Sequence, residues 1–127
     1  MPTILIADDD LYLRTMLRQI FEIEQFQVID VDDGQKAIDY IKNNPVDILI
    51  TDLIMPKKEG IETINELKNL FPDLPVFAMS GGSMTNAQVY LDIAQTLGVM
   101  HTFLKPFNIN EMLDAVKSVI SERNKQS

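Results

Sequence analysis

The sequence contains no cysteine, and its single histidine is His101. Without cysteine the chain cannot form a disulfide, a thiolate metal site or a cysteine nucleophile. One histidine also excludes any site that needs several imidazoles from this chain. The absence of cysteine fits a reducing compartment, so we expect a cytoplasmic location.

Positive charge is scarce, since 11 Lys and Arg face 19 Asp and Glu for a formal net charge of −8. An acidic protein repels phosphate backbones, so direct binding to nucleic acid is not expected. Long hydrophobic runs are missing as well. The first apolar run, residues 4–7, is far too short to cross a membrane and has no basic region before it, so neither a secretory nor a membrane segment is predicted.

Two kinds of segment alternate along the 127 residues, a length that fits one domain over 1–127. The first kind is a short, mainly apolar run, which is typical of a strand buried on both faces of a parallel sheet. These runs are residues 3–7, 28–31, 46–51, 76–79 and 101–104.

The second kind is longer and has apolar residues at helical spacing. The first stripe consists of Leu13, Met16, Leu17, Ile20 and Phe21, and the last of Ile109, Met112, Leu113, Val116, Val119 and Ile120. Capping residues are expected before four of the helices, namely Asp10, Asp33, Thr85 and Asn108. Gly98 stands where a helix C-terminal glycine belongs. The alternation predicts an α/β protein with an open parallel sheet and helices on both faces.

Polar residues follow the predicted strands, where open parallel sheets bind their ligands. They are Asp8, Asp9 and Asp10 after the first strand, Asp52 at the end of the third, Ser80 with Gly81 and Gly82 after the fourth, and Lys105 after the fifth. Several carboxylates in one pocket repel one another, and a hard divalent cation such as Mg²⁺ removes that cost. A lysine and a hydroxyl nearby could hold phosphoryl oxygens. The set therefore indicates a carboxylate nucleophile, a magnesium site and two ligands for a phosphoryl group.

Four sequence segments together are similar to the receiver domains of response regulators. They are Ile-Leu-Ile-Ala-Asp-Asp-Asp at residues 4–10, Asp-Ile-Leu-Ile-Thr-Asp-Leu-Ile-Met-Pro at 47–56 followed by Gly60, Ala-Met-Ser-Gly at 78–81, and Phe-Leu-Lys-Pro-Phe at 103–107. The resemblance implies a doubly wound (βα)5 flavodoxin-like fold whose five parallel strands have the order 2-1-3-4-5. It also implies a cis peptide bond between Lys105 and Pro106.

The resemblance further implies a role for each site residue. Asp52 would accept a phosphoryl group from a histidine kinase or a histidine phosphotransfer protein. Asp9, Asp52 and the Ile54 carbonyl would ligate Mg²⁺, and Asp8 would act through a metal-bound water. Ser80 and Lys105 would contact the phosphoryl oxygens.

Such a receiver catalyses only its own phosphoryl transfer and autodephosphorylation and is not otherwise an enzyme. Phosphorylation would switch its output surface, which a downstream protein target or output domain would read.

One position departs from the family pattern. Three residues before the lysine, receivers usually have Tyr or Phe, whose rotamer follows the switch hydroxyl. Here the residue is Thr102, and the aromatic Phe103 comes next. Strand alternation places these two side chains on opposite faces, so Phe103 is not expected to replace the switch ring.

Three other functions stay open at this point. A magnesium-dependent phosphatase of the haloacid-dehalogenase type also uses an aspartate nucleophile, and Asp8 to Asp10 contains an Asp-x-Asp, although Tyr12 stands where that family expects Thr or Val. A flavodoxin-like flavin carrier would share the fold, but the acidic groups oppose a flavin phosphate. A degenerate receiver would serve only for docking. Each residue also has a structural reading, because Asp52 or Ser80 could belong to turns and Lys105 could simply extend to solvent.

Overall fold

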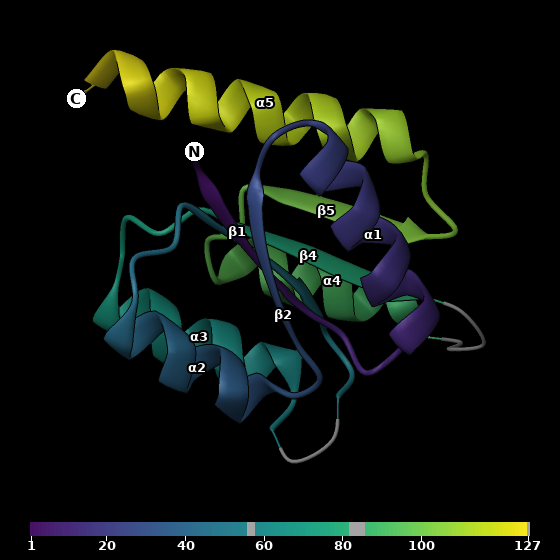
Figure 1. The fold of residues 1–127 in the computed structure, drawn as a ribbon. Coiled ribbons are helices and arrows are strands. Elements are labelled where there is room, and N and C mark those ends of the chain that lie inside the picture. Colours follow the sequence, from purple (N-terminus) through teal and green to yellow (C-terminus); the bar gives the residue numbers. More distant parts are fainter. Residues whose placement is uncertain (56–57, 82–85, 127) are drawn as a thin grey trace.

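The computed structural model describes residues 1–55, 58–81 and 86–126 (Figure 1). Three residues used in the sequence predictions, Pro56, Gly82 and Thr85, lie outside these ranges. Within these ranges, none of the helices combines the length and the apolar character that a membrane crossing requires.

Five parallel strands form one sheet of order β2-β1-β3-β4-β5. The strands are β1 (Thr3–Ala7), β2 (Gln27–Val31), β3 (Ile48–Asp52), β4 (Val76–Gly81) and β5 (His101–Lys105). The expected fold and strand order are confirmed, with ends that differ by one or two residues. Gly81 and Lys105 pair with each other and lengthen β4 and β5, because ladder hydrogen bonds do not require apolar side chains.

Five helices cover both faces of the sheet. They are α1 (Leu11–Ile23), α2 (Gly34–Asn43), α3 (Gly60–Leu70), α4 (Ala87–Thr96) and α5 (Ile109–Gln126). Helices α1 and α5 lie on one face, and α2, α3 and α4 lie on the other (Figure 1). Each face has its own apolar cluster, so the protein is doubly wound as predicted.

Strand β1 shows why the predicted strands are apolar throughout. Ile4 and Ile6 are fully buried in the cluster under α1 and α5. Leu5 and Ala7 point the other way and are fully buried under α2, α3 and α4. Since successive side chains alternate between faces, a strand covered on both sides needs an apolar residue at every position.

Local hydrogen bonds confirm three of the predicted helix caps. Asp10 Oδ1 accepts from the backbone N–H groups of Tyr12 and Leu13 at the start of α1. Asp33 caps α2 and Asn108 caps α5 in the same way. The side chains satisfy N–H groups that have no partner within the helix, which fixes where each helix begins.

Helices α1 and α4 differ in detail from the sequence patterns. Met16 is 43% exposed, so the buried part of α1 is narrower than its apolar stripe and centres on Leu17 and Phe21. Helix α4 has Asn86 as its N-cap rather than Thr85, and the Asn86 side chain makes no capping hydrogen bond. Gly98 follows α4 with φ of 99°, as a C-terminal glycine should.

Candidate functional site

The predicted site residues gather at the carboxyl edge of the sheet. Asp8 directly follows β1, Asp52 is the last residue of β3, Ser80 lies near the end of β4, and Lys105 ends β5. These four strands are consecutive in the sheet, so their ends form one continuous edge. The Lys105–Pro106 peptide bond is cis, as the resemblance implied.

Asp52 is almost fully buried and is fixed through both of its carboxylate oxygens. Oδ1 accepts a hydrogen bond of 2.8 Å from the backbone N–H of Leu53 and a longer one of 3.4 Å from that of Ile54. Oδ2 accepts from Lys105 Nζ at 3.0 Å. The chain turns directly after Asp52, and this turn aims the two N–H groups back at the carboxylate.

Lys105 connects two carboxylates from different strands. Its Nζ lies 3.0 Å from Oδ2 of Asp8 and 3.0 Å from Oδ2 of Asp52. Partial burial by itself would lower the pKa of Lys105, but the negative charges of Asp52 and Asp8 outweigh this and hold the pKa above its usual value. Lys105 is therefore a positive charge held between Asp8 and Asp52, and it does not extend freely to solvent.

Asp8 is completely buried directly after the end of β1. Its Oδ1 accepts from the backbone N–H of Asp10 at 2.9 Å. Burial, followed by the charge of Asp52, raises the pKa of Asp8 to about 6, although Lys105 acts in the opposite direction. When Asp8, Asp9 and Asp52 are all ionised, their negative charges exceed the positive charge of Lys105.

Asp9 completes a group of three carboxylates. One oxygen each from Asp8, Asp9 and Asp52 lie within 4.8 Å of one another, and Asp9 is the member exposed to solvent. Three hard oxygen donors, one of them reachable from water, suit a hard divalent cation such as Mg²⁺. Asp10, in contrast, faces its own helix as a cap and is not part of this group.

Ser80 lies near the carboxyl end of β4, the strand beside β3. Its hydroxyl oxygen is fully buried and has no hydrogen-bond partner among the residues that the structure describes. A buried hydroxyl without a partner is uncommon, because it loses its hydrogen bonds to water and gains none in return. Ser80 is therefore available to donate to a group that enters the pocket.

Gly60 lies in close contact with the backbone at the end of β3. A Cβ atom on Gly60 would lie 2.2 Å from the backbone oxygen of Asp52 and 2.5 Å from the Cα of Leu53. The Gly60 N–H donates to the Leu53 carbonyl at 2.9 Å. Only glycine permits this close approach, which anchors the loop that follows Asp52.

The aromatic switch position has the arrangement expected from strand alternation. Thr102 is half-buried and pairs with Ala78, which faces α4. Phe103 is buried on the other face, with its ring centroid 5.8 Å from that of Phe77 and 5.7 Å from that of Phe107. Phe103 belongs to the core, so it does not substitute for a ring at position 102.

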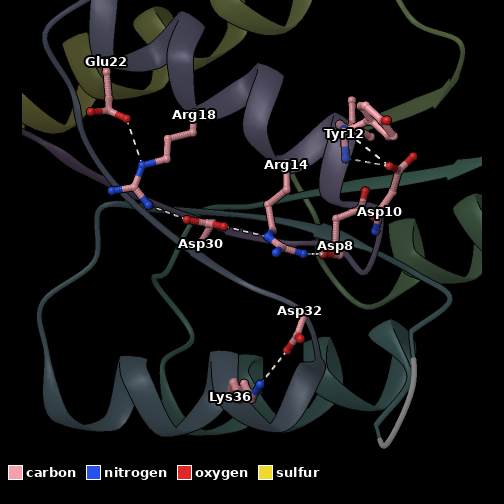
Figure 2. Close-up of polar contacts among 10 residues, drawn as sticks. Asp8, Asp10, Tyr12, Arg14, Arg18, Glu22, Asp30, Asp32 and Lys36 are labelled. Carbon is pink, nitrogen blue, oxygen red and sulfur yellow. Dashed lines mark hydrogen bonds and ion pairs between the residues drawn. The ribbon is translucent and has the colours of Figure 1, made fainter.

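A network of charged residues that was not predicted from the sequence lies beside Asp8 (Figure 2). Arg14 donates from Nη1 to the carbonyl oxygen of Asp8 at 2.8 Å and from Nε to Asp30 Oδ2 at 2.6 Å. Arg18 also pairs with Asp30, through its Nη1, and with Glu22. Two signals were present: an aspartate within an otherwise apolar strand, and two arginines four positions apart on α1.

The fold and the site together define a doubly wound α/β protein with three carboxylates, a lysine and a buried hydroxyl at the carboxyl edge of its sheet. The family model of the response regulator receiver domain matches residues 4–117. The chain therefore belongs to the response regulator receiver domain family, as its sequence motifs indicated.

Comparison with known proteins agrees with this assignment. The chain is 32% identical over 120 residues to the transcriptional regulatory protein CpxR of Escherichia coli K12, covering 94% of this chain and 50% of CpxR. It thus spans about half the length of this relative. It is also 32% identical to sporulation initiation phosphotransferase F of Bacillus subtilis, with 92% of each chain covered. A solved structure of the response regulator TrrA of Thermotoga maritima in complex with Mg²⁺ and BeF matches with a TM-score of 0.81, at 22% identity, over 94% of this chain and 99% of TrrA.

Proposed function

We propose that this receiver accepts a phosphoryl group on Asp52 from the phosphohistidine of a histidine kinase or a histidine phosphotransfer protein. The observation that carries the proposal is the position of Lys105, whose Nζ donates to Asp52 Oδ2 and to Asp8 Oδ2 at 3.0 Å each. Such an ammonium can balance charge on a phosphoryl group attached to Asp52. The names of two relatives, a transcriptional regulator and a phosphotransferase, also support a role in phosphoryl signalling.

The donor set fits Mg²⁺. Three carboxylates lie close together, and burial, followed by the charge of Asp52, raises the pKa of Asp8, so a cation is favoured beside it. Asp9 and Asp52 would hold the ion through their side chains, with the Ile54 carbonyl as a further ligand and Asp8 acting through a bound water. When bound, Mg²⁺ neutralises charge on the carboxylates and on the phosphoryl oxygens. The Mg²⁺ and BeF complex of the Thermotoga maritima relative is consistent with this assignment.

Each site residue of this chain would have its own role in the phosphoryl transfer. An oxygen of Asp52 attacks the phosphorus atom, the phosphorus–nitrogen bond of the donor breaks, and the imidazole leaves with its electron pair and takes up a proton. The N–H groups of Leu53 and Ile54 keep the carboxylate oriented for attack. Lys105 balances charge on one phosphoryl oxygen, and the unpartnered Ser80 hydroxyl donates to another.

The inward hydrogen bond of Ser80 would connect phosphorylation to the output surface. This surface is the face formed by α4, β5 and α5, which a downstream protein or output domain would bind. Phosphorylation would shift the population between two pre-existing states of that face. The protein would catalyse only its own phosphorylation and dephosphorylation. Residues 1–127 would act as one receiver domain. A cytoplasmic location stays a prediction.

The position of Asp10 favours a receiver over a phosphatase of the haloacid-dehalogenase type. That phosphatase needs the second aspartate of its Asp-x-Asp motif in the pocket, whereas Asp10 caps α1 with its carboxylate. A degenerate receiver that only docks is disfavoured by the ammonium and carboxylates being in place around Asp52.

The test is the intact mass of the protein after incubation with acetyl phosphate and Mg²⁺. We expect one phosphoryl adduct on the wild type and on Asp39→Asn, an exposed aspartate on α2, and none on Asp52→Asn. An adduct of equal yield on Asp52→Asn would refute the proposal. Release of phosphate from small phosphate esters over many turnovers would favour the phosphatase instead.

A further inference from the structure

Asp8 is fixed at each of its polar groups by a different residue. Its N–H donates to the Val31 carbonyl at 3.1 Å, Oδ1 accepts from the Asp10 N–H, and Oδ2 accepts from Lys105. The remaining polar group is the carbonyl oxygen, which accepts from Arg14 Nη1 at 2.8 Å (Figure 2). Arg14 therefore supplies the contact that fixes the direction of the Asp8 carbonyl.

Arg14 itself is held by Asp30 on β2. The two side chains are only 14% and 20% exposed, and the distance from Arg14 Nε to Asp30 Oδ2 is 2.6 Å. Burial alone would raise the pKa of Asp30, but the hydrogen bonds from Arg14 and Arg18 outweigh it and lower the pKa. A planar guanidinium that donates in two directions at once has a defined orientation, unlike a solvated side chain.

We propose that Arg14 is a positioning residue for the magnesium site. The Asp8 carbonyl and the Asp9 N–H belong to one planar peptide unit. By binding the carbonyl, Arg14 therefore fixes the orientation of the peptide that leads into Asp9. Asp9 is exposed, and the direction of its carboxylate depends on that backbone. Arg14 thus keeps the Asp9 oxygen close to those of Asp8 and Asp52. The inference rests on the proposed function, since it takes Mg²⁺ as the ligand.

The direction in which Mg²⁺ affinity changes when Arg14 is removed distinguishes a positioning role from a purely electrostatic one. Removing a cation close to an acidic pocket should, by Coulomb's law alone, tighten the binding of Mg²⁺. If Arg14 acts by orienting the Asp8–Asp9 peptide, its removal should weaken binding instead. Loss of residues that orient metal ligands typically lowers metal affinity by about 10–100-fold.

The test is the dissociation constant of Mg²⁺ measured by titration calorimetry without a phosphoryl donor. Arg18→Ala is a matched control, because Arg18 lies one turn further along α1 and pairs with Asp30 and Glu22 but not with the Asp8 carbonyl. We expect Arg14→Ala to weaken Mg²⁺ binding by about tenfold or more and Arg18→Ala to leave it close to wild type. Arg14→Lys keeps the charge but has only one nitrogen donor, so we expect a loss of about threefold or more. The amide resonance of Asp9 should shift in the Arg14 variants before any Mg²⁺ is added.

A purely structural role predicts a different pattern. In that case Arg14→Ala and Arg18→Ala would both lower the melting temperature through Asp30, and the folded variants would bind Mg²⁺ as the wild type does. Wild-type or tighter affinity in folded Arg14→Ala overturns the inference. If circular dichroism shows that Arg14→Ala does not fold, wild-type affinity in Arg14→Lys overturns it. A wild-type protein that binds no Mg²⁺ overturns the proposed metal site itself, and the inference with it.

Discussion

Lys105 and Asp8 are 97 positions apart in the sequence, yet Nζ of the lysine lies 3.0 Å from Oδ2 of the aspartate. Strands β3 and β4 separate their two strands in the sheet, so the lysine side chain reaches across the carboxyl edge. The same Nζ contacts Asp52 Oδ2 on β3 at the same distance. One ammonium thus offsets part of the repulsion between two carboxylates at close range.

Replacing this ammonium should destabilise the protein when Mg²⁺ is absent. In Lys105→Met, Asp8 and Asp52 lose their shared positive partner, and we expect the free energy of unfolding at pH 7 to fall by about 2–4 kcal/mol. Urea unfolding in EDTA measures this, and added Mg²⁺ should recover more stability in the variant than in the wild type. Lys36→Met, which removes an exposed pair with Asp32, is the control and should change little. Equal losses in the two variants would contradict the prediction.

The pKa of Asp8 predicts how stability depends on pH. Because burial and the charge of Asp52 raise this pKa to about 6, the folded protein holds the Asp8 proton more tightly than the unfolded chain does. The stabilising contribution is complete below the usual aspartate pKa and is lost as the pH rises through about 6. Its size is on the order of 3 kcal/mol.

Asp8→Asn isolates that contribution from other groups that titrate. Without Mg²⁺, the variant should gain stability relative to the wild type between pH 4 and pH 7, and the difference should level off above the pKa of Asp8. Urea unfolding at several pH values, in EDTA, gives the difference curve. A difference that is constant over this pH range would show that Asp8 titrates normally.

The hydroxyl of Ser80 should reduce stability before phosphorylation. Its oxygen is buried without a partner in the described part of the chain, so Ser80→Ala removes an unsatisfied group and should raise the free energy of unfolding by about 1 kcal/mol. Thr51→Val is a matched comparison, because the buried Thr51 Oγ1 donates to the Asp52 carbonyl at 2.9 Å. That variant should lose stability. Guanidinium unfolding measures both, and a loss in Ser80→Ala as large as in Thr51→Val would mean that Ser80 already has a partner.

Gly60 should tolerate no side chain. The Cβ of Gly60→Ala would lie 2.2 Å from the Asp52 backbone oxygen, so the loop after β3 must move away. We expect a loss of about 1–3 kcal/mol in stability and slower labelling of Asp52 by acetyl phosphate. Chemical denaturation and intact mass measure the two effects. Wild-type stability together with wild-type labelling would mean that the loop has room for the methyl group.

Local features of the structure followed from the sequence, because covalent geometry and side-chain chemistry act over a few residues. The alternating faces of a strand explain why Leu5 and Ile6 are both buried, and short-range hydrogen bonds explain the caps at Asp10 and Asp33. The narrower stripe on α1 could not be predicted in the same way. Whether Met16 is covered depends on which helix packs beside α1, and helical spacing does not contain that information.

The polar residues that end the strands, and so the chemistry available at one edge of the sheet, can be identified in the amino-acid sequence. Which of these residues contact one another depends on the three-dimensional packing of the strands and helices. The contact of Lys105 with Asp8 and the connection from Asp30 through Arg14 to the Asp8 carbonyl both join different elements. Such contacts depend on strand order and on how helices pack against the sheet. Those are set by the burial of the whole core and not by any short stretch of residues.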